Sequence, residues 1–159
     1  MAIDRSTLGY RPCVGIVLAN ANGHIFAGQR LDFVSDAWQM PQGGVDKGED
    51  AQTAALRELS EETGLPASAV RIEAQTAGWV TYELPDELIP KLWGGKYRGQ
   101  KQMWFLMRLV GDESLINIKT QIPEFSRWQW MAPDALLASI APFKRAVYEA
   151  VLAELGPKL

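Results

Sequence analysis

The sequence contains one cysteine, Cys13, and one histidine, His24. One cysteine cannot form a disulfide within the chain, which favours a reducing, cytoplasmic setting. Cys13 lies in an apolar run with no histidine near it in the sequence, so we expect a small core residue rather than a nucleophile. A Ser-His-Asp or Cys-His mechanism would depend on His24 alone, beside a predicted turn, and we set that class of enzyme aside.

The chain also lacks long apolar runs and an excess of either charge. No segment approaches the roughly 18 apolar residues that would cross a membrane, and the first residues do not form a secretory signal. The net charge of −3 argues against a large, non-specific nucleic-acid binder, and we expect no DNA partner. With 159 residues, 47% of them hydrophobic, the chain suits a single domain spanning residues 1–159. The sequence does not define an oligomeric state, and a monomer is compatible with it.

The charged residues are unevenly distributed along the chain. Six acids lie between residues 46 and 62, whereas five bases and no acid lie between residues 88 and 108. An acidic centre that faces this basic segment would suit a metal ion together with a phosphate-rich ligand.

The order of the predicted elements favours an α/β fold. Apolar and alternating patterns predict strands at residues 13–19, 24–30, 70–84, 100–110 and 125–131. Helices are predicted at residues 50–63, ended by Gly64, and at residues 142–155. Glycine and proline make residues 31–48 mostly loop, and residues 85–99 a loop or a short helix. Strands in the middle of the chain with helices early and late indicate a mixed sheet covered on both faces.

The predicted helix at residues 50–63 carries an unusual acidic face. Glu58, Glu61 and Glu62 are spaced so that their carboxylates share one side of the helix, within an arc of about 100°. Like charges this close destabilise a bare helix, and glutamate near its C-terminus opposes the helix dipole. A bound divalent cation would offset both effects, since hard cations such as Mg²⁺ prefer carboxylate oxygens. A solvated acidic helix is the alternative. An EF-hand is excluded because it needs alternating Asp or Asn ligands within one loop, and this segment lacks them.

The spacing of these glutamates matches a known motif. From Gly43 the sequence reads Gly-x5-Glu-x7-Arg-Glu-Leu-x-Glu-Glu-x-Gly-Leu, which fits the Nudix box at each fixed position. The chain therefore resembles the Nudix hydrolases. The resemblance implies an α/β/α sandwich around a mixed sheet. It also implies a Mg²⁺-dependent enzyme, with Mn²⁺ or another divalent cation as an alternative, that hydrolyses phosphoanhydride bonds.

The same resemblance implies roles for individual residues. The implied metal ligands are Gly43, through its carbonyl, and the carboxylates of Glu58, Glu61, Glu62 and Glu124. Arg57 would orient a neighbouring glutamate by a charge-assisted hydrogen bond. Glu49 and Gly48 would shape the loop. The implied reaction is attack on phosphorus by a water molecule that the metal activates, with Glu124 either completing the metal site or acting as general base.

Segments outside the box resemble one branch of the family over residues 10–155. They include Tyr10-Arg11-Pro12, Pro123-Glu124-Phe125 and the run from Gln100 to Phe105. Enzymes of this branch remove pyrophosphate from the 5′-triphosphate end of RNA. The remaining 5′-monophosphate promotes mRNA decay. The branch is also described as hydrolysing dinucleoside polyphosphates, and residues 84–97 look closer to plant-type diadenosine tetraphosphate hydrolases.

Candidate substrate contacts lie among the basic and aromatic residues. Arg and Lys match phosphate oxygens, and the candidates of this kind are Arg11, Arg30, Lys101 and Lys144. Alternatively, each of them could be an ordinary solvated residue on the surface. Phe143, with Tyr82 or Tyr97, could stack on a base, although Phe143 could equally belong to the core.

Four functional hypotheses follow. The first is pyrophosphate removal from 5′-triphosphorylated RNA, and the second is cleavage of diadenosine tetraphosphate or pentaphosphate to release ATP. A nucleotide-cleaning enzyme acting on dNTPs is a third, which the long segment from residue 85 to 101 disfavours. The fourth is a binding module without catalysis, which the complete set of box glutamates disfavours.

Overall fold

The computed structural model describes residues 4–31 and 36–159, and its strands form one mixed sheet. The sheet order is β4-β6-β1-β2-β7, with β3 paired to β1 and β5 paired to β6. The strands are β1 (Gly9–Ala19), β2 (Ile25–Arg30), β3 (Gln42–Gly44), β4 (Val70–Gln75), β5 (Val80–Glu83), β6 (Tyr97–Leu109) and β7 (Phe125–Met131). β1 and β6 run parallel, and the other pairs are antiparallel. The predicted α/β class with a mixed sheet is confirmed.

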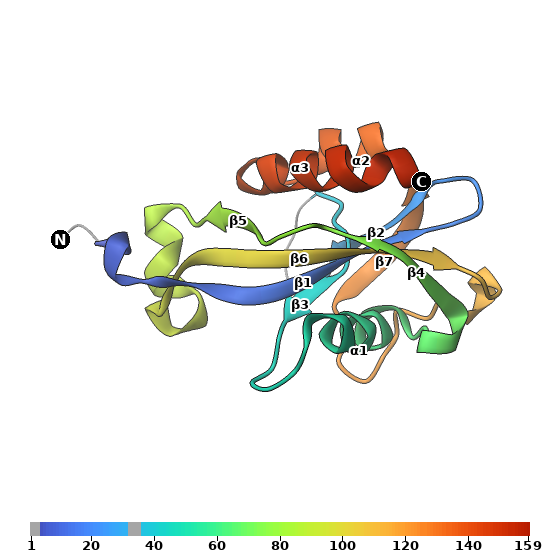
Figure 1. Ribbon diagram of the computed structural model, residues 1–159, viewed down its shortest axis with the longest axis horizontal. Coiled ribbons are helices and arrows are strands. Elements are labelled where there is room, and N and C mark those ends of the chain that lie inside the picture. Colours follow the sequence, from blue (N-terminus) through green and yellow to red (C-terminus); the bar gives the residue numbers. More distant parts are fainter. Residues whose placement is uncertain (1–3, 32–35) are drawn as a thin grey trace.

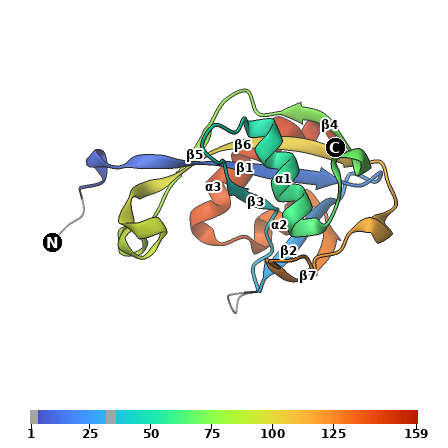
Figure 2. The ribbon, with the colours of Figure 1, turned by 90° about the horizontal axis from the view of Figure 1, so that it is seen from below.

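Helices cover both faces of this sheet (Figure 1). α1 (Ala51–Thr63) lies on one face, whereas α2 (Pro133–Ser139) and α3 (Arg145–Leu155) lie on the other. Figure 2, seen from below, places α1 in front of the sheet with α3 and α2 behind it. Side chains alternate along β1, so Val14 and Ile16 pack in the core under α1, and Val17 packs in the core under α3. None of the helices in the described ranges is long and apolar enough to cross a membrane.

Several element boundaries differ from those expected from the sequence. β1 begins at Gly9 rather than residue 13, because Tyr10 to Pro12 already pair with β6. The extended segment expected at residues 70–84 is two strands, β4 and β5, separated at residues 76–79. Residues 85–99 contain two 3₁₀ turns, Asp86–Lys91 and Trp93–Gly95, before β6 begins.

Two elements were not expected at all. Residues 31–48, predicted to be mostly loop, contain β3, in which Gly43 lies opposite Val14 of β1. Glycine has no strand preference, so the pairing comes from the neighbouring strand rather than from local sequence. α2 was also missed, and α3 begins at Arg145 after a 3₁₀ turn rather than at residue 142.

α1 is defined at both ends by its own sequence. The Asp50 side chain accepts a hydrogen bond from the Thr53 amide at 3.3 Å, which caps the N-terminus. Gly64 adopts a left-handed conformation with φ of +76° and ends the helix as expected. The Thr63 carbonyl accepts a hydrogen bond from the Asn117 amide at 2.7 Å, which joins this end to the segment before β7. These contacts hold both ends of α1 in place, and with them the side of the helix that carries the glutamates.

Candidate active site

Arg57 on α1 connects the glycine-rich loop to the acidic helix face. Its Nε and Nη2 donate to the two carboxylate oxygens of Glu49, each at 2.9 Å, and Nη2 also donates to the Gly44 carbonyl at 2.9 Å. Its Nη1 donates to Glu58 at 3.0 Å and to Glu61 at 3.2 Å. Hydrogen bonding to Arg57 lowers the pKa of Glu49 to about 2. A single guanidinium thus holds the loop against the helix and orients two carboxylates.

Gly43 and Glu58 lie in close contact. A Cβ atom at Gly43 would lie 2.0 Å from the Glu58 carboxyl carbon and 2.2 Å from each of its oxygens. Only glycine leaves room for that carboxylate against the backbone of β3. Gly48, further along the loop, has φ of +81°, a conformation that glycine adopts without strain. The glycine pattern therefore brings loop backbone and carboxylate together.

Glu58 is largely buried and Glu62 almost fully buried, so both carboxylates are poorly solvated. Burial raises the pKa of Glu58 to about 7, and the neighbouring Glu61 adds to the effect against the opposing Arg57. Glu62 is 3% exposed, and burial together with Glu58 raises its pKa well above the ordinary value. The Gln42 backbone amide donates a hydrogen bond to Glu62, yet Oε2 of Glu62 has no partner among the described residues. A divalent cation would fit these residues, because it would neutralise the crowded carboxylates and complete their coordination.

The glutamates open onto two adjoining cavities. We call the larger one, of about 530 Å³, the cleft, and the other, of about 420 Å³, the acidic chamber. Glu58, Glu61 and Glu124 line both, whereas Glu62 lines the chamber. Within the described parts of the chain, no three acidic, histidine or cysteine side chains form a ready-made metal cage. The carboxylates share a cavity, but Arg57 draws Glu58 and Glu61 toward itself.

Basic residues also line the cleft. They are Arg11, Arg30 and Lys144, three of the four candidates from the sequence. The Arg11 guanidinium lies over the Trp93 ring, 5.2 Å from its centroid, and beside the backbone of Gly44. Nη2 of Arg30 lies 3.9 Å from Oε2 of Glu124. The cleft thus combines carboxylates with bases, which suits binding of a cation together with a polyphosphate.

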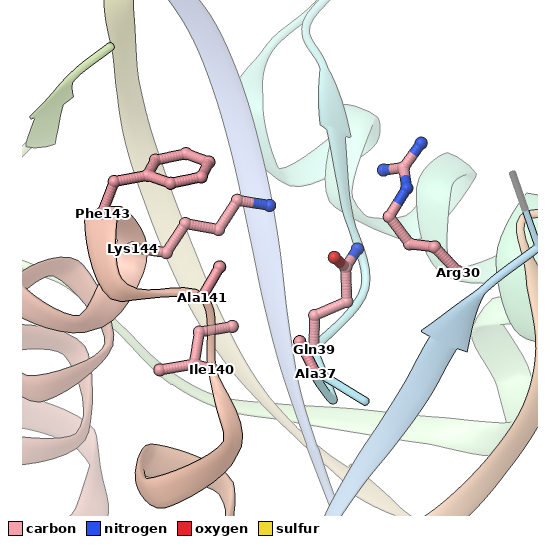
Figure 3. A pocket seen from close by; sticks show the side chains of 7 residues that line it. All are labelled: Arg30, Ala37, Gln39, Ile140, Ala141, Phe143 and Lys144. Atoms are coloured by element: carbon pink, nitrogen blue, oxygen red, sulfur yellow. The ribbon is translucent and has the colours of Figure 1, made fainter. Parts of the chain in front are cut away.

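Figure 3 shows a smaller hollow of about 80 Å³ beside the cleft, between β2 and the turn before α3. Arg30, Gln39, Ile140, Phe143 and Lys144 contribute to its walls, and the Lys144 ammonium points inward. Burial, together with the nearby positive charge of Arg30, lowers the pKa of Lys144 to about 8.

The aromatic candidates occupy different positions relative to the cleft. Phe143 is 37% exposed, and its ring centroid lies 5.9 Å from that of Tyr82, so it forms cleft wall rather than core. Tyr97 does not line the cleft and packs edge-on against Trp93.

The structure does not bring Lys101 to the cleft. Its ammonium lies over the Trp79 ring, 4.8 Å from the centroid, on the other face of the sheet from Gln100 and Gln102. None of the five bases between residues 88 and 108 lines the cleft. The expectation that a basic segment faces the acidic centre is therefore wrong. That segment contributes Leu88, Leu92 and Trp93 instead, which form an apolar wall.

Sequence reasoning also missed a buried amide network beneath the cleft. Gln102 Nε2 donates to Gln100 at 2.6 Å and to Gln42 at 3.1 Å, and its Oε1 accepts from Trp104 Nε1 at 2.8 Å. Gln42 and Gln100 both line the cleft. The alternation of Gln100 and Gln102 along a strand is the signal that could have placed them on one buried face.

Known proteins match this chain over nearly its whole length. A family model of the NUDIX domain matches residues 9–151. An RNA pyrophosphohydrolase from Cereibacter sphaeroides is 57% identical over 157 residues, covering 99% of this chain and 97% of the relative. An RNA pyrophosphohydrolase from Sphingopyxis alaskensis is 54% identical over 155 residues, covering 98% of each.

Solved structures share the fold at lower identity. The E. coli dihydroneopterin triphosphate pyrophosphohydrolase matches with a TM-score of 0.69 and 22% identity, over 91% of this chain and 99% of that one. A C. elegans Ap4A hydrolase complex matches with a TM-score of 0.65 and 20% identity, over 92% of this chain and 98% of that one. At these identities the likeness concerns the fold alone.

Proposed function

The chain belongs to the Nudix hydrolase family, and from that premise we propose that it removes pyrophosphate from the 5′-triphosphate end of RNA. The likeness to RNA pyrophosphohydrolases over nearly the full length carries this proposal. A cleft lined by carboxylates and by Arg11, Arg30 and Lys144 supports it. The product would be a 5′-monophosphate end, which promotes decay of the transcript. A cytoplasmic location stays a prediction.

We propose that Glu58, Glu61, Glu62 and Glu124, with the Gly43 carbonyl, hold the divalent cation, and that this cation is Mg²⁺. When bound, it would lower the pKa of the attacking water and offset charge on the phosphates. Two features support this assignment: the burial of the Glu58 and Glu62 carboxylates, and Oε2 of Glu62, which has no hydrogen-bond partner among the described residues. Arg57 orients Glu58 and Glu61, and Glu49 braces the loop through Arg57.

The chain's own residues would bind and orient the substrate. Arg11, Arg30 and Lys144 bind the phosphates, which aligns the scissile bond before reaction. Phe143, beside Tyr82, offers an aromatic face to a base. Glu124 lines both cavities, and it would either complete the metal site or take a proton from the attacking water.

A second substrate, diadenosine tetraphosphate or pentaphosphate, is favoured by one feature of the cleft. Its wall contains Tyr82, Trp93 and Phe143 in addition to the bases, so a nucleoside at each end of a polyphosphate would meet an aromatic ring. The chemistry is the same as for RNA, and ATP would be one product.

A comparison of products separates these substrates. Triphosphorylated RNA, diadenosine tetraphosphate and dGTP are supplied at equal concentration with Mg²⁺, and products are resolved over time. We expect pyrophosphate release from RNA with the highest kcat/KM. Faster ATP release from the dinucleotide would favour the second substrate, and hydrolysis of dGTP alone would exclude both.

Lys144 gives the proposed binding a pH dependence. Its ammonium loses its proton as the pH rises through about 8, and a neutral amine no longer attracts phosphate. One unit above that pKa, about a tenth of the side chains stay charged, so KM should rise about tenfold. Lys144→Arg keeps its charge throughout this range and should remove the rise. A pH-independent KM in the unmodified chain would show that Lys144 does not contact the phosphates.

A further inference from the structure

The Arg11 guanidinium is held in the cleft by uncharged groups. Its Cζ lies 5.2 Å from the centroid of the Trp93 ring, and its Nη1 donates to Sγ of Cys13 at 3.3 Å. Among the residues that the structure describes, no carboxylate forms an ion pair with Arg11, whereas Nη2 of Arg30 lies 3.9 Å from Glu124. The positive charge of Arg11 is therefore not compensated by a carboxylate of the described residues, and it stays available to an anionic ligand.

Gly44 leaves space for this guanidinium beside the glycine-rich loop. A Cβ atom at Gly44 would lie 2.6 Å from Nη2 of Arg11, closer than a side chain could approach. The Gly44 carbonyl accepts from Arg57, which also donates to Glu58 and Glu61. Arg11 and Arg57 therefore approach the same glycine, so a phosphate bound by Arg11 would lie close to the carboxylates proposed to hold the cation.

Trp93 has an unusual backbone conformation. Its φ is +47°, and within the described ranges it is the one residue other than glycine with a positive φ. A bulky side chain adopts this left-handed region only where the surrounding structure imposes it. Here the two flanking turns impose it, because the Leu92 amide donates to the Leu88 carbonyl at 3.1 Å and the Gly95 amide donates to the Leu92 carbonyl at 2.9 Å. The strained position is the one that places a ring over Arg11.

The segment that carries Trp93 is fixed to the rest of the fold by its own contacts. Nη2 of Arg5 donates to the Leu84 carbonyl at 2.9 Å, and the same guanidinium pairs with Glu83 and Asp86. Ile89, between the two ends of the segment, is 1% exposed and packs in the core. The Trp93 ring is therefore held in place by contacts that do not depend on a substrate.

We propose that Trp93 is a positioning residue, whose ring holds the Arg11 guanidinium beside Gly44 so that it can bind a phosphate of the substrate. The inference rests on the proposed phosphate contact of Arg11 and adds the residue that sets its position. A guanidinium already fixed in one orientation loses less entropy on binding, so its hydrogen bonds to phosphate contribute more to affinity. Because the ring acts through Arg11, its removal should weaken binding of the phosphates themselves, even in a ligand without a base.

Calorimetric titration of the full chain with a methylene-bridged inorganic triphosphate, at saturating Mg²⁺, tests this directly. This ligand has no base, and its P–C bonds prevent hydrolysis. We expect Trp93→Leu to raise its Kd about fivefold and Arg11→Gln to raise it about thirtyfold. Trp93→Phe keeps a ring under the guanidinium at the same backbone position, so its Kd should stay within about twofold of that of the unmodified chain.

Trp79→Leu is the matched control. The Lys101 ammonium lies over the Trp79 ring, 4.8 Å from its centroid, yet neither residue lines the cleft. This substitution also removes a ring that contacts a cation, and it should leave the Kd unchanged.

The double variant separates positioning of Arg11 from damage to the fold. In the Arg11→Gln background, Trp93→Leu should have no further effect on the Kd, because the residue through which it acts has been removed. An equal loss of affinity in both backgrounds would overturn the inference, since general damage to the cleft does not depend on Arg11. An unchanged Kd for Trp93→Leu alone would overturn it too.

Two further outcomes separate this inference from the proposed function. If Trp93→Leu raises KM for triphosphorylated RNA but not the Kd of the inorganic ligand, the ring stacks on a base and the inference is wrong, while the proposed function stands. If Arg11→Gln leaves the Kd unchanged, the proposed phosphate contact of Arg11 is wrong, and the inference with it. Failure of the unmodified chain to hydrolyse RNA would overturn the proposed substrate, whereas the comparison of Kd values would still decide the role of Trp93.

Discussion

Replacing Glu58 with glutamine should abolish nearly all hydrolysis while leaving the fold intact. Glutamine has the same shape and can still hydrogen bond, but it removes one of the charges proposed to hold the cation. If the loss of transition-state stabilisation is about 4 kcal/mol, the rate falls about 10³-fold. The measurement is kcat/KM on triphosphorylated RNA at saturating Mg²⁺.

Thermal melting distinguishes loss of the cation site from loss of the fold. Burial already raises the pKa of Glu58 to about 7, so the charged form is unfavourable in the absence of a cation. Glu58→Gln should therefore melt at or above the temperature of the unmodified chain without Mg²⁺. Added Mg²⁺ should raise the melting temperature of the unmodified chain but not that of the variant.

A surface glutamate serves as the control for this substitution. Glu149 forms an exposed pair with Arg145 on α3, on the other face of the sheet from α1. Glu149→Gln removes an exposed ion pair, which contributes about 0–1 kcal/mol to the free energy of unfolding, and should leave activity unchanged. Full activity of Glu58→Gln with Mg²⁺ would show that the site has been assigned to the wrong residues.

The sequence was most informative where local pattern and spacing decide the structure. α1 follows from its composition, its Asp50 cap and Gly64, and the order of its glutamates follows from helical periodicity. β7 also has the expected bounds, since Trp128 and Trp130 alternate with polar residues. In each case the interactions that define the element lie within a few residues of one another.

The sequence was least informative where distant segments meet. Arg11 of β1 meets Trp93 of the segment before β6, and Lys144 meets Arg30, only because the sheet and α3 bring them together. A count of bases between residues 88 and 108 carries no information on which face each occupies. Strand alternation sends Gln100 and Gln102 toward the cleft side and Lys101 away from it. The number of bases in a stretch of sequence is thus a poor guide to the positive charge in the site.

Gly43→Ala should separate the position of the Glu58 carboxylate from the stability of the fold. The added Cβ would lie 2.0–2.2 Å from that carboxylate, so the carboxylate must move. The group that moves is the end of a flexible side chain, and Gly43 is not among the glycines with positive φ. The free energy of unfolding should therefore change little. A displacement of about 1 Å at a reacting centre can cost about 10²-fold in rate, which is the expected fall in kcat.

Gly78→Ala is the matched control for this substitution, because an added Cβ there meets no atom of the described residues within 4 Å. It should change neither kcat nor the melting temperature. Unfolding of Gly43→Ala would mean that β3 itself requires glycine, and full activity would mean that the Glu58 carboxylate can work from a displaced position. The expected result lies between these, a folded chain with impaired catalysis. It would show that Gly43 in the motif is required by the carboxylate it contacts, because the backbone at that position is one that alanine can adopt.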